Sequence, residues 1–329
     1  MSSSVRFASP HRRLGSLKRL VLAVALAGLA AAGTPAAAQA APQHPVPYGL
    51  VPALANYFDR ESSPPGANDW NCRPSAEHPE PVVLVHGSTA TMAGNWQTMS
   101  PLLANNGYCV FALNYGIDPA APVPLNLIPG TKSMRESSIN ELAPFVDRVL
   151  AATGAQKVNL VGHSEGTIMP RWYIKFGGGA DKVAKSVNLT PLNDGTQAGG
   201  QALFAQALAA LGVWDDLQLR GEAFAFGAAL QMTKGSDYLA QVNSGDAYPA
   251  GIDYTFIMTR WDQVVVPHTS GMGPIAPNVT NIVLQDQCPL TLVEHAGVGG
   301  DAVAAQHILN ALDPVNRVPV NCFGRPRNG

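Results

Sequence analysis

The pentapeptide Gly-His-Ser-Glu-Gly at residues 162–166 constrains the fold of this chain more than any other sequence feature. It follows an apolar run at 158–161 and precedes a segment of helical composition at 167–176. A serine hydroxyl becomes a useful nucleophile when a sharp turn from a strand into a helix presents it, and glycines on either side relieve the crowding there. We therefore predict that Ser164 is a catalytic nucleophile at a strand–turn–helix junction.

Short apolar runs that alternate with helical segments extend this pattern along the chain. The apolar runs lie at 81–86, 109–114 and 158–161, and residues 183–189, 254–259 and 279–284 have the pattern of further strands. Further helices are expected at 96–105, 139–150 and 303–312. Continuous apolar runs are typical of strands that are buried on both faces of a sheet. The sequence therefore predicts an α/β fold, with a mostly parallel sheet flanked by helices, over residues 81–329.

Two segments do not follow the alternation of strands and helices. Residues 41–80 are rich in Pro, Asn and Ser, and we expect an irregular N-terminal arm packed on the domain. The apolar stretch at 197–243 has no strand pattern, and we expect a small helical cap inserted over the sheet. Ordinary core helices would give the same pattern in that stretch, because periodicity does not separate the two.

Residues 1–40 have the pattern of an export signal. Five basic residues and no acidic one precede or begin the apolar run at 20–30, which is shorter than the roughly 20 residues needed to span a bilayer. The sequence Ala38-Gln39-Ala40 fits a small-x-small cleavage site. We predict a signal peptide, a secreted, extracellular protein, and no stable membrane anchor after cleavage. Twin-arginine export stays open beside the general route, because Arg12 and Arg13 are adjacent.

Cleavage of this leader would also change the charge of the chain. The full sequence has 21 Lys and Arg against 23 Asp and Glu, and loss of the five basic residues leaves 16 against 23, or about −7. No basic run remains that would contact a phosphate backbone, so we expect no nucleic acid partner.

The four cysteines are Cys72, Cys109, Cys288 and Cys322. An even number in an exported chain indicates two disulfides, for which three connectivities exist. We expect Cys72–Cys109, which flank one predicted strand, and Cys288–Cys322, which flank the last helix. A metal site is the alternative interpretation, but no Cys-x-x-Cys or paired Cys/His spacing supports it, so we expect no metal.

The oxyanion that forms when Ser164 attacks a carbonyl needs hydrogen-bond donors. One is expected from the backbone N–H of Glu165, within the turn itself. The other is expected from the loop after the strand that ends at His86, with Ser88 the first candidate and Thr89 the second. The Glu165 side chain is expected to point away and to be hydrogen-bonded, since a carboxylate there would oppose the charge of the oxyanion.

The acid and the base should follow the serine in that order, each after a later strand. Asp262 lies just past the strand at 254–259, and His295 lies in a glycine-rich loop between the last strand and the last helix. Asp194 is the second candidate for the acid. Among the other late histidines, His268 is close in sequence to Asp262 and His307 lies inside the final helix. We predict a Ser164–Asp262–His295 triad that forms an acyl-enzyme and needs no cofactor.

Several longer runs, among them PVVLVHGS, VNLVGHSEGT, LTPLNDGT, RWDQVVVPHTSG and VEHAGVGGDAVAAQHILNAL, resemble secreted bacterial triacylglycerol lipases of the class 2 type. The likeness extends from about Trp70 to the last helix. It implies an α/β-hydrolase fold, an acylglycerol or activated ester as substrate, a lipid–water interface as a possible site of action, and the same triad. It also implies disulfides near both ends of the domain.

Other functions fit parts of this pattern. A polyester hydrolase or cutinase-like esterase would use the same triad in a more open groove. An acyltransferase acting on cell-wall lipids would need an acceptor that outcompetes water. A binding protein on the same scaffold would be expected to lose Ser164 or His295, and the chain keeps both.

Overall fold

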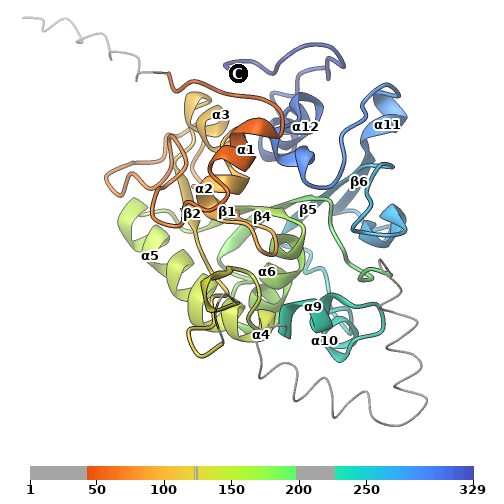
Figure 1. The fold of residues 1–329 in the computed structure, drawn as a ribbon. Helices are drawn as coiled ribbons and strands as arrows, with labels where there is room; N and C mark the ends of the chain where they lie inside the picture. Colours follow the sequence, from red (N-terminus) through yellow and green to blue (C-terminus); the bar gives the residue numbers. More distant parts are fainter. Residues whose placement is uncertain (1–42, 122, 124, 198–226) are drawn as a thin grey trace, which may run out of the picture. The chain divides into compact units, whose positions relative to one another are not determined.

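A central parallel sheet organises the protein (Figure 1). The computed structural model describes residues 43–121, 123, 125–197 and 227–329. Its six strands pair in the order β2-β1-β3-β4-β5-β6, and every neighbouring pair is parallel. The strands are β1 (Val82–Val85), β2 (Val110–Leu113), β3 (Val158–His163), β4 (Val183–Leu189), β5 (Asp253–Met258) and β6 (Val279–Val283). Each lies on one of the segments predicted as strands, so the expected α/β sheet is confirmed.

Burial on both faces explains why the inner strand β1 is a continuous apolar run. In β1 all four residues are buried: Val83 and Val85 pack on one face of the sheet, and Val82 and Leu84 pack on the other. Successive side chains of a strand point to opposite faces, so a strand covered on both sides needs an apolar residue at every position.

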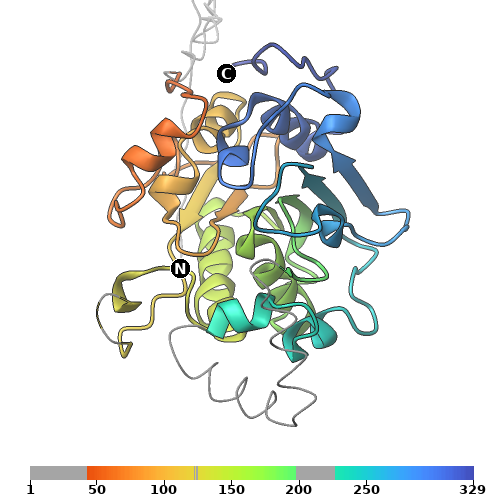
Figure 2. The same ribbon diagram turned by 45° about the vertical axis from the view of Figure 1, so that its right-hand side comes forward.

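Helices cover both faces of the sheet (Figures 1 and 2). On one face α5 (Ala143–Thr153), α6 (Glu165–Phe176) and α10 (Asp237–Val242) contribute to the core cluster that contains Val83. On the other, α3 (Met99–Asn105) and α12 (Ala302–Leu312) contribute to the cluster that contains Leu84. This three-layer arrangement, with helices on both faces of a parallel sheet, is the α/β fold class that the sequence predicted. The shorter helical elements are α1 (Val51–Ala55), α2 (Met92–Asn95), η1 (Leu125–Leu127), α4 (Met134–Ser137), the π-helix η2 (Ser138–Leu142), α9 (Gly227–Met232), η4 (His268–Gly271), α11 (Leu284–Gln287) and η5 (Gly297–Gly300).

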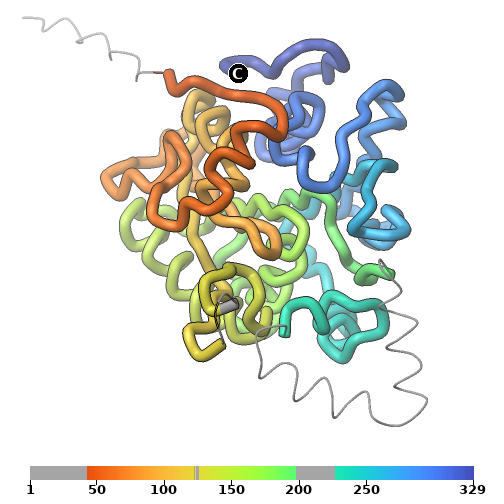
Figure 3. Tube along the Cα trace, in the orientation of Figure 1, coloured from red at the N-terminus to blue at the C-terminus, as the bar shows by residue number. Residues whose placement is uncertain are grey.

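The arm before β1 is irregular except for the short helix α1. Figure 3 shows the arm as the red and orange part of the trace. A disulfide joins Cys72 of the arm to Cys109 at the start of β2, with the two Cα atoms 5.8 Å apart. A second joins Cys288 to Cys322, with Cα atoms 5.3 Å apart. These are the two pairs expected from the flanking elements.

Two sequence predictions fall largely on residues that the structure does not describe. The expected signal peptide, 1–40, lies outside the described residues, and so do residues 198–226 of the expected cap. The rest of that stretch contains α9 and α10, which pack on the same side of the sheet as α6. In the part of the chain that is described, no helix is both long enough and apolar enough to cross a membrane.

Candidate active site

Ser164 lies between β3 and α6, at the sharp turn that the sequence predicted. Its φ of 53° and ψ of −121° place it in a backbone conformation that a residue with a side chain rarely adopts. Two glycines make the turn possible. A Cβ on Gly162 would lie 2.0 Å from the carbonyl oxygen of Gly166, and one on Gly166 would lie 2.1 Å from that of Val85. The backbone thus crosses too closely at both positions for any other residue.

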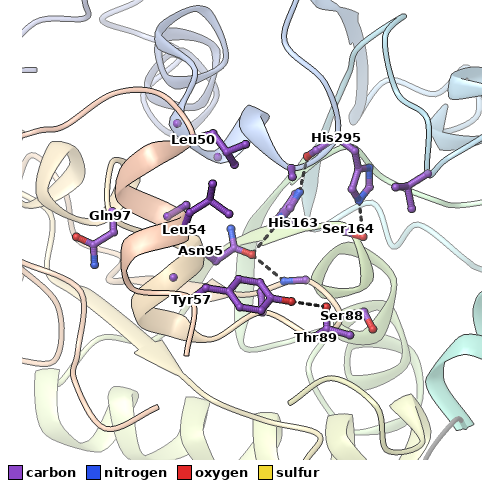
Figure 4. A pocket seen from close by; sticks show the side chains of 18 of the residues that line it. Leu50, Leu54, Tyr57, Ser88, Thr89, Asn95, Gln97, His163, Ser164 and His295 are labelled. Atoms are coloured by element: carbon purple, nitrogen blue, oxygen red, sulfur yellow. Dashed lines mark hydrogen bonds between the residues drawn. The ribbon is translucent and has the colours of Figure 1, made fainter. Parts of the chain in front are cut away.

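Three side chains meet at the carboxyl edge of the sheet, and each follows a different strand: Ser164 follows β3, Asp262 follows β5 and His295 follows β6. His295 Nε2 is 2.9 Å from Ser164 Oγ, and His295 Nδ1 is 2.9 Å from Asp262 Oδ2 and 3.0 Å from Oδ1. Figure 4 shows the contact between His295 and Ser164. The side chain of Asp262 is only 2% exposed, and its Oδ1 accepts hydrogen bonds from the backbone N–H groups of Val264 and Val265.

The alternative acid and bases lie elsewhere. Asp194 makes an ion pair with Lys234, with Oδ2 and Nζ 2.6 Å apart. His268 lies in η4 and His307 in the buried part of α12, and neither lines the pocket that contains Ser164. The structure therefore brings together the three residues predicted from the strand ends and none of these alternatives.

Two backbone N–H groups are available beside Ser164. The N–H of Glu165 is at the first turn of α6, where helix donors have no partner within the helix. The N–H of Ser88 donates to no acceptor in the described residues. Thr89, the second candidate in the sequence, is wrong as a donor because its N–H is occupied by the carbonyl oxygen of Pro129 at 3.0 Å. Ser88 and Glu165 are thus the pair that geometry favours.

The side chain of Glu165 differs from the expectation. It is fully buried, and neither carboxyl oxygen meets the geometry of a hydrogen bond with a described residue, although the hydroxyls of Ser88 and Tyr115 lie close enough to act on it. Burial raises the pKa of Glu165 to about 8, against the opposing effect of the hydroxyls of Ser88 and Tyr115. A carboxyl group held in its neutral form puts no negative charge beside an oxyanion at neutral pH.

Sequence analysis missed two buried side chains that link the oxyanion loop to the base. Asn95 Oδ1 accepts the N–H of Gly87 at 2.9 Å and lies 2.9 Å from His163 Nδ1. The other ring nitrogen of His163, Nε2, is 3.0 Å from the carbonyl oxygen of His295, as Figure 4 shows.

Burial, and to a smaller extent His295, lowers the pKa of His163 to about 3, so its ring is neutral and carries one N–H. Only one of its two oxygen contacts is therefore a hydrogen bond. The position of His163 directly before the serine was the one signal in the sequence for such a role.

A pocket of about 440 Å³ opens above Ser164. Among the described residues that line it there is no Asp, Glu, Lys or Arg, and backbone of the oxyanion loop is combined there with apolar side chains from three parts of the chain. These are Leu50, Ala53, Leu54 and Tyr57 from the arm, Leu192 and Val264 from loops after strands, and Ala229 and Met232 from α9.

The described residues contain one set of side chains spaced to share a metal ion. Ligand atoms of Glu77, His78 and Asp313 lie within 4.8 Å of one another. None of the three lines the pocket above Ser164.

Comparison with known proteins identifies the family of the chain. Residues 79–307 match the model of the family described as Lipase (class 2). The chain belongs to the class 2 lipase family. That match contains Ser88, Ser164, Asp262 and His295, and it begins at residue 79, at the end of the arm.

Curated relatives of this class 2 lipase chain are similar over a shorter stretch. A triacylglycerol lipase of Pseudarthrobacter phenanthrenivorans is 32% identical over 97 residues, which are 28% of this chain and 27% of the relative. One of Burkholderia plantarii is also 32% identical over 97 residues, covering 28% of this chain and 24% of the relative. The matched region thus spans about a quarter of each relative.

Among solved structures, Aspergillus fumigatus lipase B superimposes with a TM-score of 0.56 at 17% identity, over 79% of this chain and 57% of that one. At that identity the similarity shows the shared fold of this class 2 lipase family member and nothing finer.

Proposed function

We propose that this protein is a secreted carboxylic ester hydrolase that acts on acylglycerols or related lipid esters. The observation that carries the proposal is the chain of contacts from Asp262 through His295 to Ser164, at the base of a pocket whose described lining contains no Asp, Glu, Lys or Arg. The class 2 lipase family and the two curated triacylglycerol lipases support the substrate class.

In the proposed reaction, His295 Nε2 takes the proton of Ser164 Oγ as the oxygen attacks the ester carbonyl. Asp262 holds the N–H of His295 Nδ1 and stabilises the imidazolium that forms. The N–H groups of Ser88 and Glu165 stabilise the oxyanion. The imidazolium then gives its proton to the leaving alcohol, and a water activated by His295 hydrolyses the acyl-enzyme.

Secretion is supported by two features. The leader at 1–40 has the sequence of a signal peptide, and the two disulfides are of the kind that form and persist outside the reducing cytosol. The mature chain would then begin just before the arm.

The first test is hydrolysis of p-nitrophenyl esters from acetate to palmitate by the oxidised mature protein. We expect turnover that Ser164→Ala lowers by about 10⁴-fold to 10⁶-fold, because the variant lacks the attacking oxygen. The exposed Ser62→Ala is the matched control and should keep wild-type rates. Absence of ester cleavage by the wild type, or full activity in Ser164→Ala, would contradict the proposal.

A further inference from the structure

The arm that precedes the family match forms one wall of the pocket above Ser164. The match begins at residue 79, whereas Leu50, Ala53, Leu54 and Tyr57 of the arm line the pocket. Figure 4 shows Leu50, Leu54 and Tyr57 on the side of the cavity opposite Ser164 and His295. The proposed catalytic residues therefore lie within the family match, whereas this wall of the pocket lies before it.

The core does not account for the apolar side chains of α1. None of its five residues is buried, and Val51 and Leu54 are 76% and 59% exposed. A helix without a fully buried residue contributes less to folding through the hydrophobic effect than a core helix does. Its apolar residues therefore need another reason, and the pocket beneath them provides one.

The arm is nevertheless held in a definite position by hydrogen bonds on both sides of α1. Before the helix, the N–H of Gly49 donates to the carbonyl oxygen of Gly300 at 2.9 Å. The hydroxyl of Thr98 donates to the carbonyl oxygen of Pro47 at 2.6 Å. After it, the hydroxyls of Tyr57 and Thr89 lie 2.9 Å apart, which ties the arm to the oxyanion loop.

The domain also provides glycines where the arm approaches most closely. A Cβ on Gly300 would lie 2.3 Å from the carbonyl oxygen of Gly49, and one on Gly94 would lie 3.0 Å from Cα of Tyr57. The backbone of the arm thus lies against positions that carry no side chain. Such close contact at two points is what a fixed wall requires.

The side chains of the arm that line the pocket are apolar, so they favour contact with an apolar part of a ligand. Leu50, Ala53 and Leu54 face a cavity whose opposite side carries Leu192, Met232 and Val264, with no formal charge on any of them. We propose that the arm residues Leu50, Ala53 and Leu54 form the binding surface for an aliphatic chain of the ester. In this way a segment outside the family match sets the preferred chain length. This inference rests on the proposed ester hydrolysis.

The test compares substitutions at two positions of α1 that lie on different sides of the helix. Ala53→Phe places a ring in the pocket, while Val51→Phe adds the same side chain at a residue that does not line it. Rates are measured on p-nitrophenyl acetate, octanoate and palmitate, and on a matched series of alkyl acetates in which the alcohol chain is lengthened. Thermal melting of each variant monitors folding.

We expect Ala53→Phe to lower the ratio of kcat/KM for long over short chains by about tenfold or more, a typical effect of crowding a hydrophobic pocket. Val51→Phe should keep the wild-type ratio. The series that responds identifies the chain: the p-nitrophenyl esters report the acyl chain and the alkyl acetates the alcohol chain. Leu54→Ala, which removes apolar surface without adding bulk, should also lower the ratio and covers the case in which Ala53→Phe does not fold.

Unchanged ratios in both Ala53→Phe and Leu54→Ala, with ester cleavage intact, would overturn the inference and leave the proposed function standing. An equal change in Val51→Phe would also overturn it. A wild type that cleaves no ester would overturn the proposed function and the inference together.

Discussion

A buried carboxylic acid directly after the proposed nucleophile is the least expected feature at the scale of single residues. Glu165 has a pKa raised to about 8 by burial, whereas a glutamate in the unfolded chain titrates near 4.5. Between those two values the folded protein holds a proton that the unfolded chain has lost. The free energy of unfolding therefore falls as pH rises through that window, and the full stability is present only below it.

Replacement of Glu165 by glutamine should remove this dependence, because an amide has nearly the shape of the protonated acid and does not ionise. We expect the stability of Glu165→Gln relative to wild type to increase by about 1.4 kcal/mol per pH unit between roughly pH 5.5 and 7.5. Urea denaturation at several pH values measures the difference. Glu61→Gln, at an exposed position, is the control, and parallel pH profiles for wild type and Glu165→Gln would refute the prediction.

At the scale of secondary-structure elements, the turn between β3 and α6 depends on two glycines. Gly166→Ala would place a Cβ 2.1 Å from the carbonyl oxygen of Val85 in β1. The helix and the strand must separate to relieve this contact, so we expect a loss of stability on the order of 3 kcal/mol and a large loss of activity.

The comparison variant is Gly251→Ala, since a Cβ there meets nothing within 4 Å. We expect its stability to change by about 0.5 kcal/mol at most. Thermal or urea denaturation of both variants checks the prediction, which fails if the two substitutions have similar effects.

Elements with strong local patterns could be predicted from the sequence. Continuous apolar runs indicated β1 and β2, which are buried throughout, and shorter or mixed strand patterns indicated the other four strands. The carboxyl ends of the strands indicated where Asp262 and His295 should lie. Gly154 at the end of α5 has a φ of 75°, the left-handed conformation in which glycine commonly ends a helix, so that boundary could also be predicted.

Features fixed by contacts between distant residues could not be predicted. The pocket wall in α1 is held in place by hydrogen bonds from the arm to Thr98 and Gly300. A helix of five residues is too short to show a periodic pattern in sequence, and these distant contacts leave no local pattern either. The missing partners of the Glu165 carboxyl depend on what surrounds the turn in space. The link from Asn95 to His163 joins residues 68 positions apart, and neither residue type marks that contact in sequence.

At the scale of the whole molecule, the two disulfides tie peripheral segments to the sheet. Cys72–Cys109 closes a loop between residues 37 positions apart and joins the arm to β2. Because a cross-link of that span restricts the unfolded chain, we expect the Cys72→Ser, Cys109→Ser double variant to lose roughly 3 to 4 kcal/mol of unfolding free energy.

Urea denaturation without reductant measures this loss. Wild type with reductant, in which both disulfides are opened, should lose at least as much stability as the double variant. An unchanged denaturation midpoint in the double variant would refute the prediction.

Each disulfide loop also encloses one part of the proposed machinery: Ser88 and Asn95 lie between Cys72 and Cys109, and His295 lies between Cys288 and Cys322. A protease that cuts after the exposed Arg317 therefore breaks the chain without releasing either piece. The segment with His295 stays attached to the C-terminal fragment through Cys288–Cys322, and the break becomes visible on a gel only after reduction. In the proposed secreted form, which would meet proteases, a single cut in either loop thus leaves the parts of the proposed active site covalently joined.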